Sequence, residues 1–166
     1  MSTNENLMEA FAGESQANRK YLAFAAKADK DGYPQVARLF RAVASAETIH
    51  AHAHLRVVGG IKDTLENLQE AAEGEAHEFQ SMYPEFLKVA EAEENKPAQT
   101  SIKHAMAVEE VHHGLYQEAI QAVKAGKDLE NATIYVCSVC GNTHIGTPPE
   151  KCEVCGVPAA KFAAVE

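Results

Sequence analysis

Residues 44–56 read ASAETIHAHAHLR, so a glutamate and three histidines fall close together in one short stretch. Glu47 and His50 stand three positions apart, and residues at this separation lie on the same face of a helix. A carboxylate and an imidazole placed in this way can bind one metal ion together. In a glutamate-rich helical protein, however, a single motif of this kind is more often a solvated helix face. Motifs elsewhere in the chain distinguish between these two interpretations.

A second Glu-x-x-His motif favours the metal site. The stretch from Val108 to Tyr116 reads VEEVHHGLY, in which Glu109 and His112 repeat the spacing of the first motif. A further glutamate precedes each motif on the previous expected helix, Glu14 before Glu47 and Glu75 before Glu109, and the two separations differ by a single position. One glutamate from each of two helices, with Glu-x-x-His from each of two others, forms a dinuclear carboxylate site in a four-helix bundle. We therefore expect a dimetal centre.

The pattern of turn residues predicts a mainly α-helical protein with four long helices. The expected helices span about residues 4–30, 34–60, 64–95 with a kink at Pro84, and 97–126. The connector GGIKD between the second and third helices has five residues and reaches at most roughly 18 Å. The second helix, at about 1.5 Å per residue, is roughly twice as long. Such a connector cannot return the chain along the bundle, so the helices either alternate in direction or exchange a pair with a second chain.

The repeat also sorts the remaining histidines. His54 follows His50 by four positions on the same face, but its counterpart in the second motif is Tyr116, which is not an expected ligand. We therefore expect His54 in the core or beside a ligand, and His52 exposed or at an interface. No metal role is expected for the other candidates: Glu110, His113, His77, His104 and His144.

Three further side chains are positioned to assist the dimetal site. Glu78 follows Glu75 by three positions and offers a seventh ligand, which suggests a site that changes its coordination. Tyr21 follows Glu14 by about two helical turns, and Tyr83 follows Glu75 by a similar separation, so both rings could point along the ligand face. Phenols there would hydrogen-bond the carboxylates and fix their orientation. The alternatives are a solvated glutamate and two ordinary core tyrosines.

The cysteines form a second metal motif at the end of the chain. CSVCGN and CEVCGV are two C-x-x-C-G loops, and they contain all four cysteines: Cys137, Cys140, Cys152 and Cys155. Four thiolates suit a single iron or a zinc equally well by spacing alone. Beside a dimetal centre, a redox-active iron is the more economical interpretation. We expect a helical dimetal domain over residues 1–130 and a four-cysteine domain over 131–166, which is too small to fold without its metal.

The net charge and the apolar pattern of the sequence limit the possible binding partners and the cellular location. The formal net charge is −9, which disfavours binding to nucleic acid or to an anionic membrane surface. No apolar run is long enough to span a bilayer. The first residues, MSTNENLMEAFAGES, lack the charged and apolar regions of a signal peptide. We expect a cytoplasmic protein with no nucleic-acid or membrane partner.

Taken together, these motifs resemble the rubrerythrin family over essentially the whole chain. The matching pieces are GESQA, AETIHAH, GEAHEFQSMYPEF, EEVHHGLY and the paired cysteine loops of YVCSVCG and PPEKCEVCG. The resemblance implies a ferritin-like four-helix bundle with a diiron centre, followed by a rubredoxin-like β domain that holds one iron. Its diiron ligands would be Glu14, Glu47, His50, Glu75, Glu78, Glu109 and His112.

The resemblance also implies an activity. Rubrerythrins reduce hydrogen peroxide to water, with electrons from a rubredoxin or an NAD(P)H-linked reductase that pass through the four-cysteine iron to the diiron pair. In the family one iron shifts between a glutamate and a histidine, which match Glu78 and His50. Tyr21 and Tyr83 match family residues beside the diiron site.

Some relatives with short connectors exchange helix pairs between subunits, and the short reach of the GGIKD connector favours this arrangement. We therefore expect a homodimer, with a tetramer as the alternative, in which Glu14, Glu47 and His50 meet the second ligand group of the partner chain. Two other functions stay open from the sequence. One is a ferroxidase or iron-binding protein, and the other is a non-catalytic metal-binding protein with a zinc ribbon.

Overall fold

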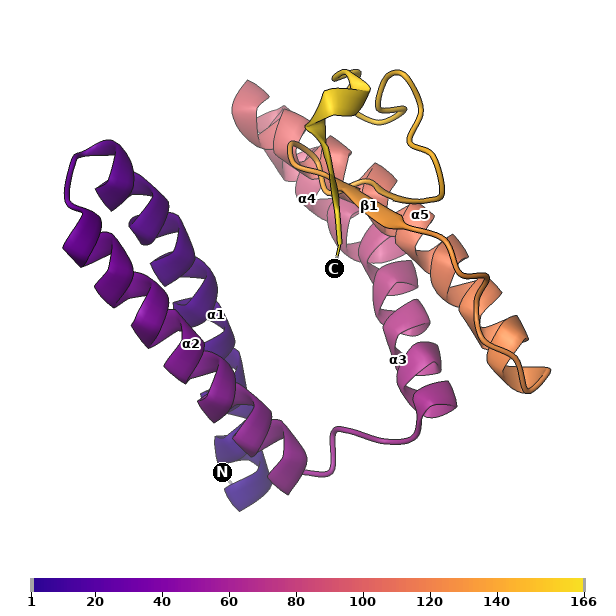
Figure 1. The fold of residues 1–166 in the computed structure, drawn as a ribbon, viewed down its shortest axis with the longest axis horizontal. Coiled ribbons are helices and arrows are strands. Elements are labelled where there is room, and N and C mark those ends of the chain that lie inside the picture. Colours follow the sequence, from indigo (N-terminus) through magenta and orange to yellow (C-terminus); the bar gives the residue numbers. More distant parts are fainter. Residues whose placement is uncertain (1, 166) are drawn as a thin grey trace. The chain divides into compact units, whose positions relative to one another are not determined.

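The computed structural model describes residues 2–165 and divides the chain into two compact units, one ending at Lys62 and one beginning at Asp63 (Figure 1). The first unit is a pair of antiparallel helices. The second combines a helical pair with a small sheet. No helix among the described residues is both long and apolar enough to cross a membrane.

The first unit consists of α1 (Thr3–Lys30) and α2 (Pro34–Val57). Ser2 caps α1 by accepting a hydrogen bond from the backbone N–H of Glu5, whose carboxylate accepts one in return from the N–H of Ser2. This reciprocal arrangement satisfies two backbone donors that the helix itself leaves free. Pro34 begins α2, where its missing N–H costs nothing.

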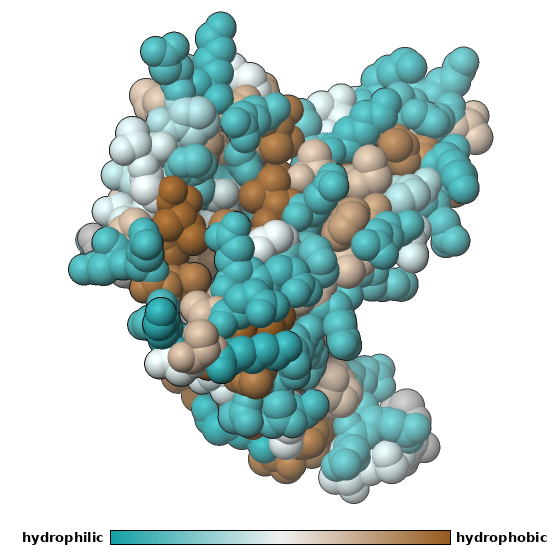
Figure 2. Space-filling view, turned by 90° about the vertical axis from the view of Figure 1, so that its right-hand side faces the viewer, coloured by the Kyte–Doolittle hydropathy of each residue, from teal (hydrophilic) through white to brown (hydrophobic). Residues whose placement is uncertain are grey.

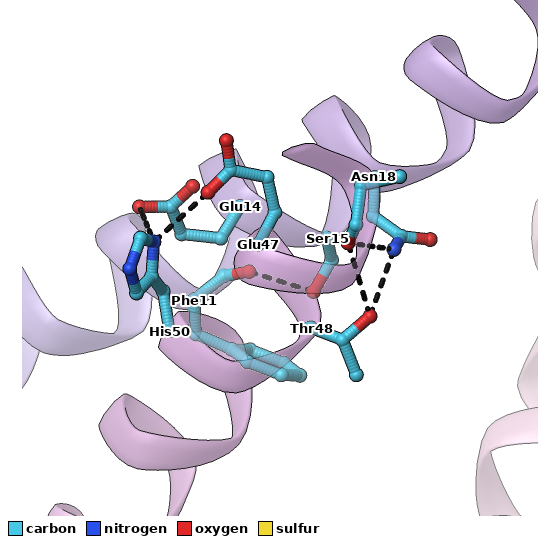
Figure 3. A network of polar contacts seen from close by, with 8 residues as sticks. Phe11, Glu14, Ser15, Asn18, Glu47, Thr48 and His50 are labelled. Atoms are coloured by element: carbon cyan, nitrogen blue, oxygen red, sulfur yellow. Dashed lines mark hydrogen bonds and ion pairs between the residues drawn. The ribbon is translucent and has the colours of Figure 1, made fainter. Parts of the chain in front are cut away.

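Alanines form the seam between α1 and α2. Ala37 is 0% exposed, and Ala25 and Ala28 are also buried, with Phe40 packed against them. Small side chains let the two helices approach closely. One turn beyond Glu14, the Asn18 side-chain amide donates hydrogen bonds to the Ala44 carbonyl and the Thr48 hydroxyl, at 2.7 and 2.8 Å (Figure 3). These bonds fix the register of one helix against the other.

Many large apolar side chains remain uncovered on this helix pair. Val36 and Leu39 precede Glu47 and His50 by about three helical turns each, so they share the face that carries these polar groups. They are 45% and 64% exposed. Figure 2 faces the right-hand side of the view in Figure 1, away from α1 and α2, and apolar patches also interrupt the hydrophilic surface on that side. The α1–α2 pair therefore has the surface of half a bundle, since an apolar face around polar ligands normally packs against further helices.

The helices of the second unit are α3 (Thr64–His77), η1 (Glu78–Met82), α4 (Tyr83–Ala92) and α5 (Lys96–Lys124). The first three form one path that packs against α5. The expected kink at Pro84 takes the form of a π-helical turn, η1, just before the proline, and the N–H of Tyr83 bonds the carbonyl of Glu78. Proline has no N–H and clashes with the carbonyl one turn earlier, so the wider turn accommodates it.

A three-stranded antiparallel sheet follows the helices, in the order β2-β1-β3. Its strands are β1 (Ile134–Cys137), β2 (Thr143–Ile145) and β3 (Phe162–Ala164), with a 3-10 turn, η2 (Ala159–Lys161), before β3. This sheet lies against α5: a Cβ atom on Gly141 would come 3.9 Å from Cγ1 of Val108. The sheet is too small for a core of its own, which leaves its cysteine loops as its main support.

The alanine seam yields a stability prediction. Ala37→Leu should lower the free energy of unfolding by about 1–3 kcal/mol, because the added atoms have no space between α1 and α2. Urea titration of the metal-loaded full chain measures the change. Ala42→Leu, on an exposed position of the same helix, is the matched control and should have little effect. Equal destabilisation by both variants would show that the seam is not tightly packed.

Candidate metal centres

The first candidate site lies between α1 and α2. Glu14 on α1 and Glu47 and His50 on α2 bring ligand atoms within 4.8 Å of one another. Nδ1 of His50 lies 2.9 Å from Oε2 of Glu47 and 3.7 Å from Oε1 of Glu14 (Figure 3). The three residues expected from the sequence to act together are thus adjacent.

The second candidate site repeats this geometry between α3 and α5. Glu75, Glu109 and His112 also place their ligand atoms within 4.8 Å. Nδ1 of His112 lies 2.8 Å from Oε2 of Glu109 and 3.9 Å from Oε1 of Glu75. Burial raises the pKa of Glu75, and the negative charge of Glu109 raises it further. Two carboxylates in this position repel each other, and a bound cation would remove the repulsion.

Both groups fit a metal ion. Two ligand atoms bound at right angles to one metal, at about 2.1 Å each, lie about 3 Å apart, close to the 2.8 and 2.9 Å between imidazole Nδ1 and carboxylate oxygen. A neutral imidazole with an unprotonated Nδ1 would otherwise present a lone pair to an oxygen that also only accepts. A cation or a proton between the two atoms resolves this contact. Each group alone supplies only three ligand residues, about half of the expected set.

The side chains expected to assist the dimetal site differ in how close they lie to the ligands. Glu78, at the start of η1, does not belong to the close group of Glu75, Glu109 and His112. The pKa of Tyr83 is raised by burial first and then by the charges of Glu78, Glu109 and Glu75, so its phenol lies among these carboxylates. This position agrees with a role beside the second group.

Tyr21 lies in an aromatic cluster. Its ring centroid is 6.3 Å from that of Phe24 and 6.2 Å from that of Phe40. Among the described residues, no hydrogen bond joins Tyr21 to Glu14. Within this helix pair, Tyr21 therefore has the contacts of an ordinary core tyrosine.

The alternative register of the second motif is not formed. His113 donates its Nδ1–H to the carbonyl of Ala72 at 2.8 Å, and its ring lies 5.8 Å from that of Phe79. This histidine therefore joins α5 to α3 and does not face Glu110. In the first motif, His52 is exposed and His54 is partly buried.

The four cysteines form the third group. Their sulfurs lie within 4.8 Å of one another, at 3.7 Å between Cys137 and Cys155 and 3.5 Å between Cys140 and Cys152. Four sulfurs bound tetrahedrally at about 2.3 Å are about 3.8 Å apart. Burial acts to raise the pKa of Cys152, but the backbone N–H groups of Cys155 and Val154 and the neighbouring thiols outweigh it and lower the pKa to about 6. One sulfur of the group is therefore readily available as a thiolate.

Two residues of this loop were not expected from the sequence. Asn142 is buried and its side-chain Nδ2 donates to Sγ of Cys152 at 3.7 Å, while its Oδ1 has no partner among the described residues. Thr143 contacts His112, although the two residues are far apart in the sequence. A polar residue directly after C-x-x-C-G is a local signal for Asn142, whereas only the fold brings Thr143 to the helix.

A cavity of about 440 Å³ opens beside the second group. Its polar lining comes from Glu75, His112 and Thr143, and the rest is largely apolar. Small molecules can therefore approach the Glu75 and His112 side chains from this side.

The helix pairs and the cysteine sheet define a class of protein: a helical metalloprotein with a carboxylate–histidine dimetal centre and a small four-thiolate domain. A family model described as rubrerythrin matches residues 5–120, and one for the rubredoxin-like domain of rubrerythrin matches residues 135–163. The chain belongs to the rubrerythrin family. The expected ferritin-like fold with a rubredoxin-like domain is confirmed, and the groups described above are those of a diiron site and a four-cysteine iron site.

Individual relatives agree with this assignment. The chain is 36% identical to rubrerythrin-2 of Clostridium acetobutylicum over 176 residues, which cover 98% of this chain and 96% of the relative. It is 37% identical to nigerythrin of Nitratidesulfovibrio vulgaris, covering 98% and 86% of the two chains. A structure of fully reduced, all-ferrous nigerythrin matches with a TM-score of 0.60 at 35% identity, covering 99% of this chain and 87% of that chain. The chain is therefore a diiron oxidoreductase of a family that acts in oxidative stress.

The metal content of single variants tests the grouping. Glu47→Ala and Glu109→Ala should each lose metal from the dimetal centre and keep the four-cysteine metal, because each removes a carboxylate that faces an imidazole. Cys152→Ser should lose the four-cysteine metal and keep the dimetal centre. Elemental analysis with visible absorption separates the two metal pools.

Glu110→Ala is the matched control, since Glu110 is the exposed neighbour of Glu109 on the same helix. This variant should keep its full metal content. Normal dimetal occupancy in Glu109→Ala, or loss of it in Glu110→Ala, would contradict the ligand assignment.

Proposed function

We propose that this protein is a non-haem diiron peroxidase that reduces hydrogen peroxide to water. The observation that carries the proposal is the presence, in one chain, of two Glu and Glu-x-x-His groups and a four-thiolate group. A dimetal centre for two-electron chemistry and a one-electron iron centre are the parts that such a peroxidase needs.

We assign seven ligands to the diiron centre and four to the mononuclear iron. The diiron ligands are Glu14, Glu47, His50, Glu75, Glu78, Glu109 and His112, and the mononuclear ligands are Cys137, Cys140, Cys152 and Cys155. The diiron domain would span residues 1–130 and the four-cysteine domain residues 131–166. When bound, the iron pair supplies the two electrons that, with two protons, convert peroxide to two water molecules.

The chain's own residues have separate roles in this proposal. Glu78 sits at the start of the π-helical turn, outside the close ligand group, and would bind one iron in the state in which His50 does not. The phenol of Tyr83, among the carboxylates of its unit, would hydrogen-bond a ligand and hold it in place. A rubredoxin or an NAD(P)H-linked reductase would deliver electrons to the cysteine sheet.

We further propose that each diiron centre combines the α1–α2 group of one chain with the α3–α5 group of a second chain. Each group supplies only about half of the expected ligands, and the α1–α2 pair exposes apolar side chains on the face that carries its ligands. Helices α2 and α3 are separated by only the residues from Val58 to Asp63. A homodimer with exchanged helix pairs meets all three conditions.

Mixed dimers of inactive chains test the exchange. In a dimer of one Glu47→Ala chain and one Glu109→Ala chain, an exchanged arrangement combines both substitutions in one centre and leaves the other intact. Peroxide turnover should therefore return to about half of the wild-type value. If each centre came from a single chain, both centres would carry one substitution and the mixed dimer would stay inactive.

The reciprocal dimer is the matched control. It pairs a wild-type chain with a chain that carries both substitutions. Exchange then damages both centres, whereas centres built within single chains leave one intact. Two different affinity tags isolate each mixed dimer, and light scattering on the purified samples tests for a dimer or a tetramer.

A single turnover tests the peroxidase activity. The protein is reduced without oxygen and mixed with one equivalent of hydrogen peroxide, and the absorption of the ferric four-cysteine centre is followed. Rapid return of this absorption, faster than with oxygen, is the expected result. Equal rates with oxygen would favour the ferroxidase alternative, and no absorption in any state would favour a zinc ribbon. Cys152→Ser should abolish donor-dependent turnover.

A further inference from the structure

His112 makes a second contact that the metal site does not require. Its Nε2 lies 2.9 Å from Oγ1 of Thr143, which is the first residue of β2. The same Oγ1 lies 3.2 Å from the carbonyl oxygen of Gly141. Thr143 therefore stands between a helical ligand residue and the loop that carries Cys140.

The two contacts fix the direction of both hydrogen bonds. The threonine hydroxyl has one proton, and the Gly141 carbonyl can only accept, so the hydroxyl donates to Gly141. Its oxygen must then accept from Nε2–H of His112. In the neutral imidazole, this assignment leaves Nδ1 of His112 without a proton and with its lone pair toward Glu109, as a metal ligand requires.

The first Glu-x-x-His motif has no equivalent contact. The side chain of His50 is 53% exposed, compared with 25% for His112. Among the residues that the structure describes, no hydrogen bond reaches Nε2 of His50. Two motifs with the same ligand geometry thus differ in how firmly their imidazoles are held.

The contact also provides a short route to the cysteine loop. Gly141 is bonded directly to Cys140 and lies beside Val108 of α5. Two hydrogen bonds and one peptide segment therefore connect the His112 ring to the Cys140 side chain. The two hydrogen bonds are the longest steps of this path, and covalent bonds make up the rest.

We propose that Thr143 is a positioning residue that fixes the tautomer and orientation of His112 and links this ligand to the Cys140 loop. Anchored imidazoles of this kind hold their metal more firmly. The link rests on the proposed function: an electron that crossed it would oxidise the four-cysteine iron from ferrous to ferric and reduce one ferric ion of the pair to ferrous. The positioning role does not depend on peroxide chemistry.

Two substitutions separate the hydroxyl from the shape of the side chain. Thr143→Val keeps the shape and removes the hydrogen bonds, whereas Thr143→Ser keeps the hydroxyl. Long-range ¹H–¹⁵N imidazole spectra of the zinc-loaded full chain report the tautomer and the solvent exchange of each Nε2–H. In the wild type and in Thr143→Ser, we expect the Nε2–H of His112 to exchange slowly with solvent.

In Thr143→Val, we expect the Nε2–H of His112 to exchange faster than in Thr143→Ser, and zinc affinity at the dimetal centre to fall roughly 10- to 100-fold. Unchanged zinc content in the cysteine sheet verifies that the variant is folded. A His112 spectrum and zinc affinity equal to those of the wild type would overturn the positioning role.

The iron-loaded protein tests the link. After mixing with peroxide, the ferric absorption of the four-cysteine centre should return at least about tenfold more slowly in Thr143→Val than in Thr143→Ser. Equal rates in the two variants would overturn the link. Failure of the wild type to show any peroxide-driven return would instead reject the proposed function, and the zinc spectra would still decide the positioning role.

Discussion

The fold depends on one electrostatic constraint: carboxylates crowded against imidazoles need a cation between them. Glu109 approaches Nδ1 of His112 to 2.8 Å, and Glu47 approaches Nδ1 of His50 to 2.9 Å. In the α3–α5 group, burial and the charge of Glu109 raise the pKa of Glu75, so without a cation the crowding of these two acids raises the free energy of the folded state. Metal binding and folding are therefore coupled, and the helix pairs serve to hold like charges together until a metal ion offsets them.

Close helix contact and metal binding use different residues within each unit. In the first unit, buried alanines bring α1 and α2 together, and Asn18 sets their register by bonding the Ala44 carbonyl. In the second unit, His113 joins α5 to α3 through the Ala72 carbonyl. Asn18 and His113, which lie on the helices within about one turn of a ligand, thus determine where along each helix pair the carboxylates meet.

Much of the candidate site could be predicted from the sequence because its geometry is local. The spacing of Glu47 and His50 determines a shared helix face, and C-x-x-C-G determines a metal loop, whatever surrounds them. The sequence predicted a kink at Pro84 but not its π-helical form, and it left open whether Tyr21 lies beside a ligand or in the core, because both depend on neighbouring backbone and side chains. The contact of Thr143 with His112 joins a strand to a helix that lies well before it in the chain, and no local pattern encodes it.

The π-helical turn explains an asymmetry between the two halves of the helical region. Helices α1 and α2, like α4 and α5, are joined by short turns of equal length, and each second helix reaches its motif glutamate at the same position along its length. Glu75 nevertheless stands one position further from Glu109 than Glu14 does from Glu47, so the second helical hairpin has one extra residue between its ligands. The π turn absorbs this extra residue, so that Tyr83 keeps the phase that Tyr21 has in the shorter hairpin.

At the start of the turn stands Glu78, whose counterpart in the shorter hairpin is Ala17. The extra residue and the additional carboxylate of Glu78 thus occur together, in the hairpin that contains the π-helical turn.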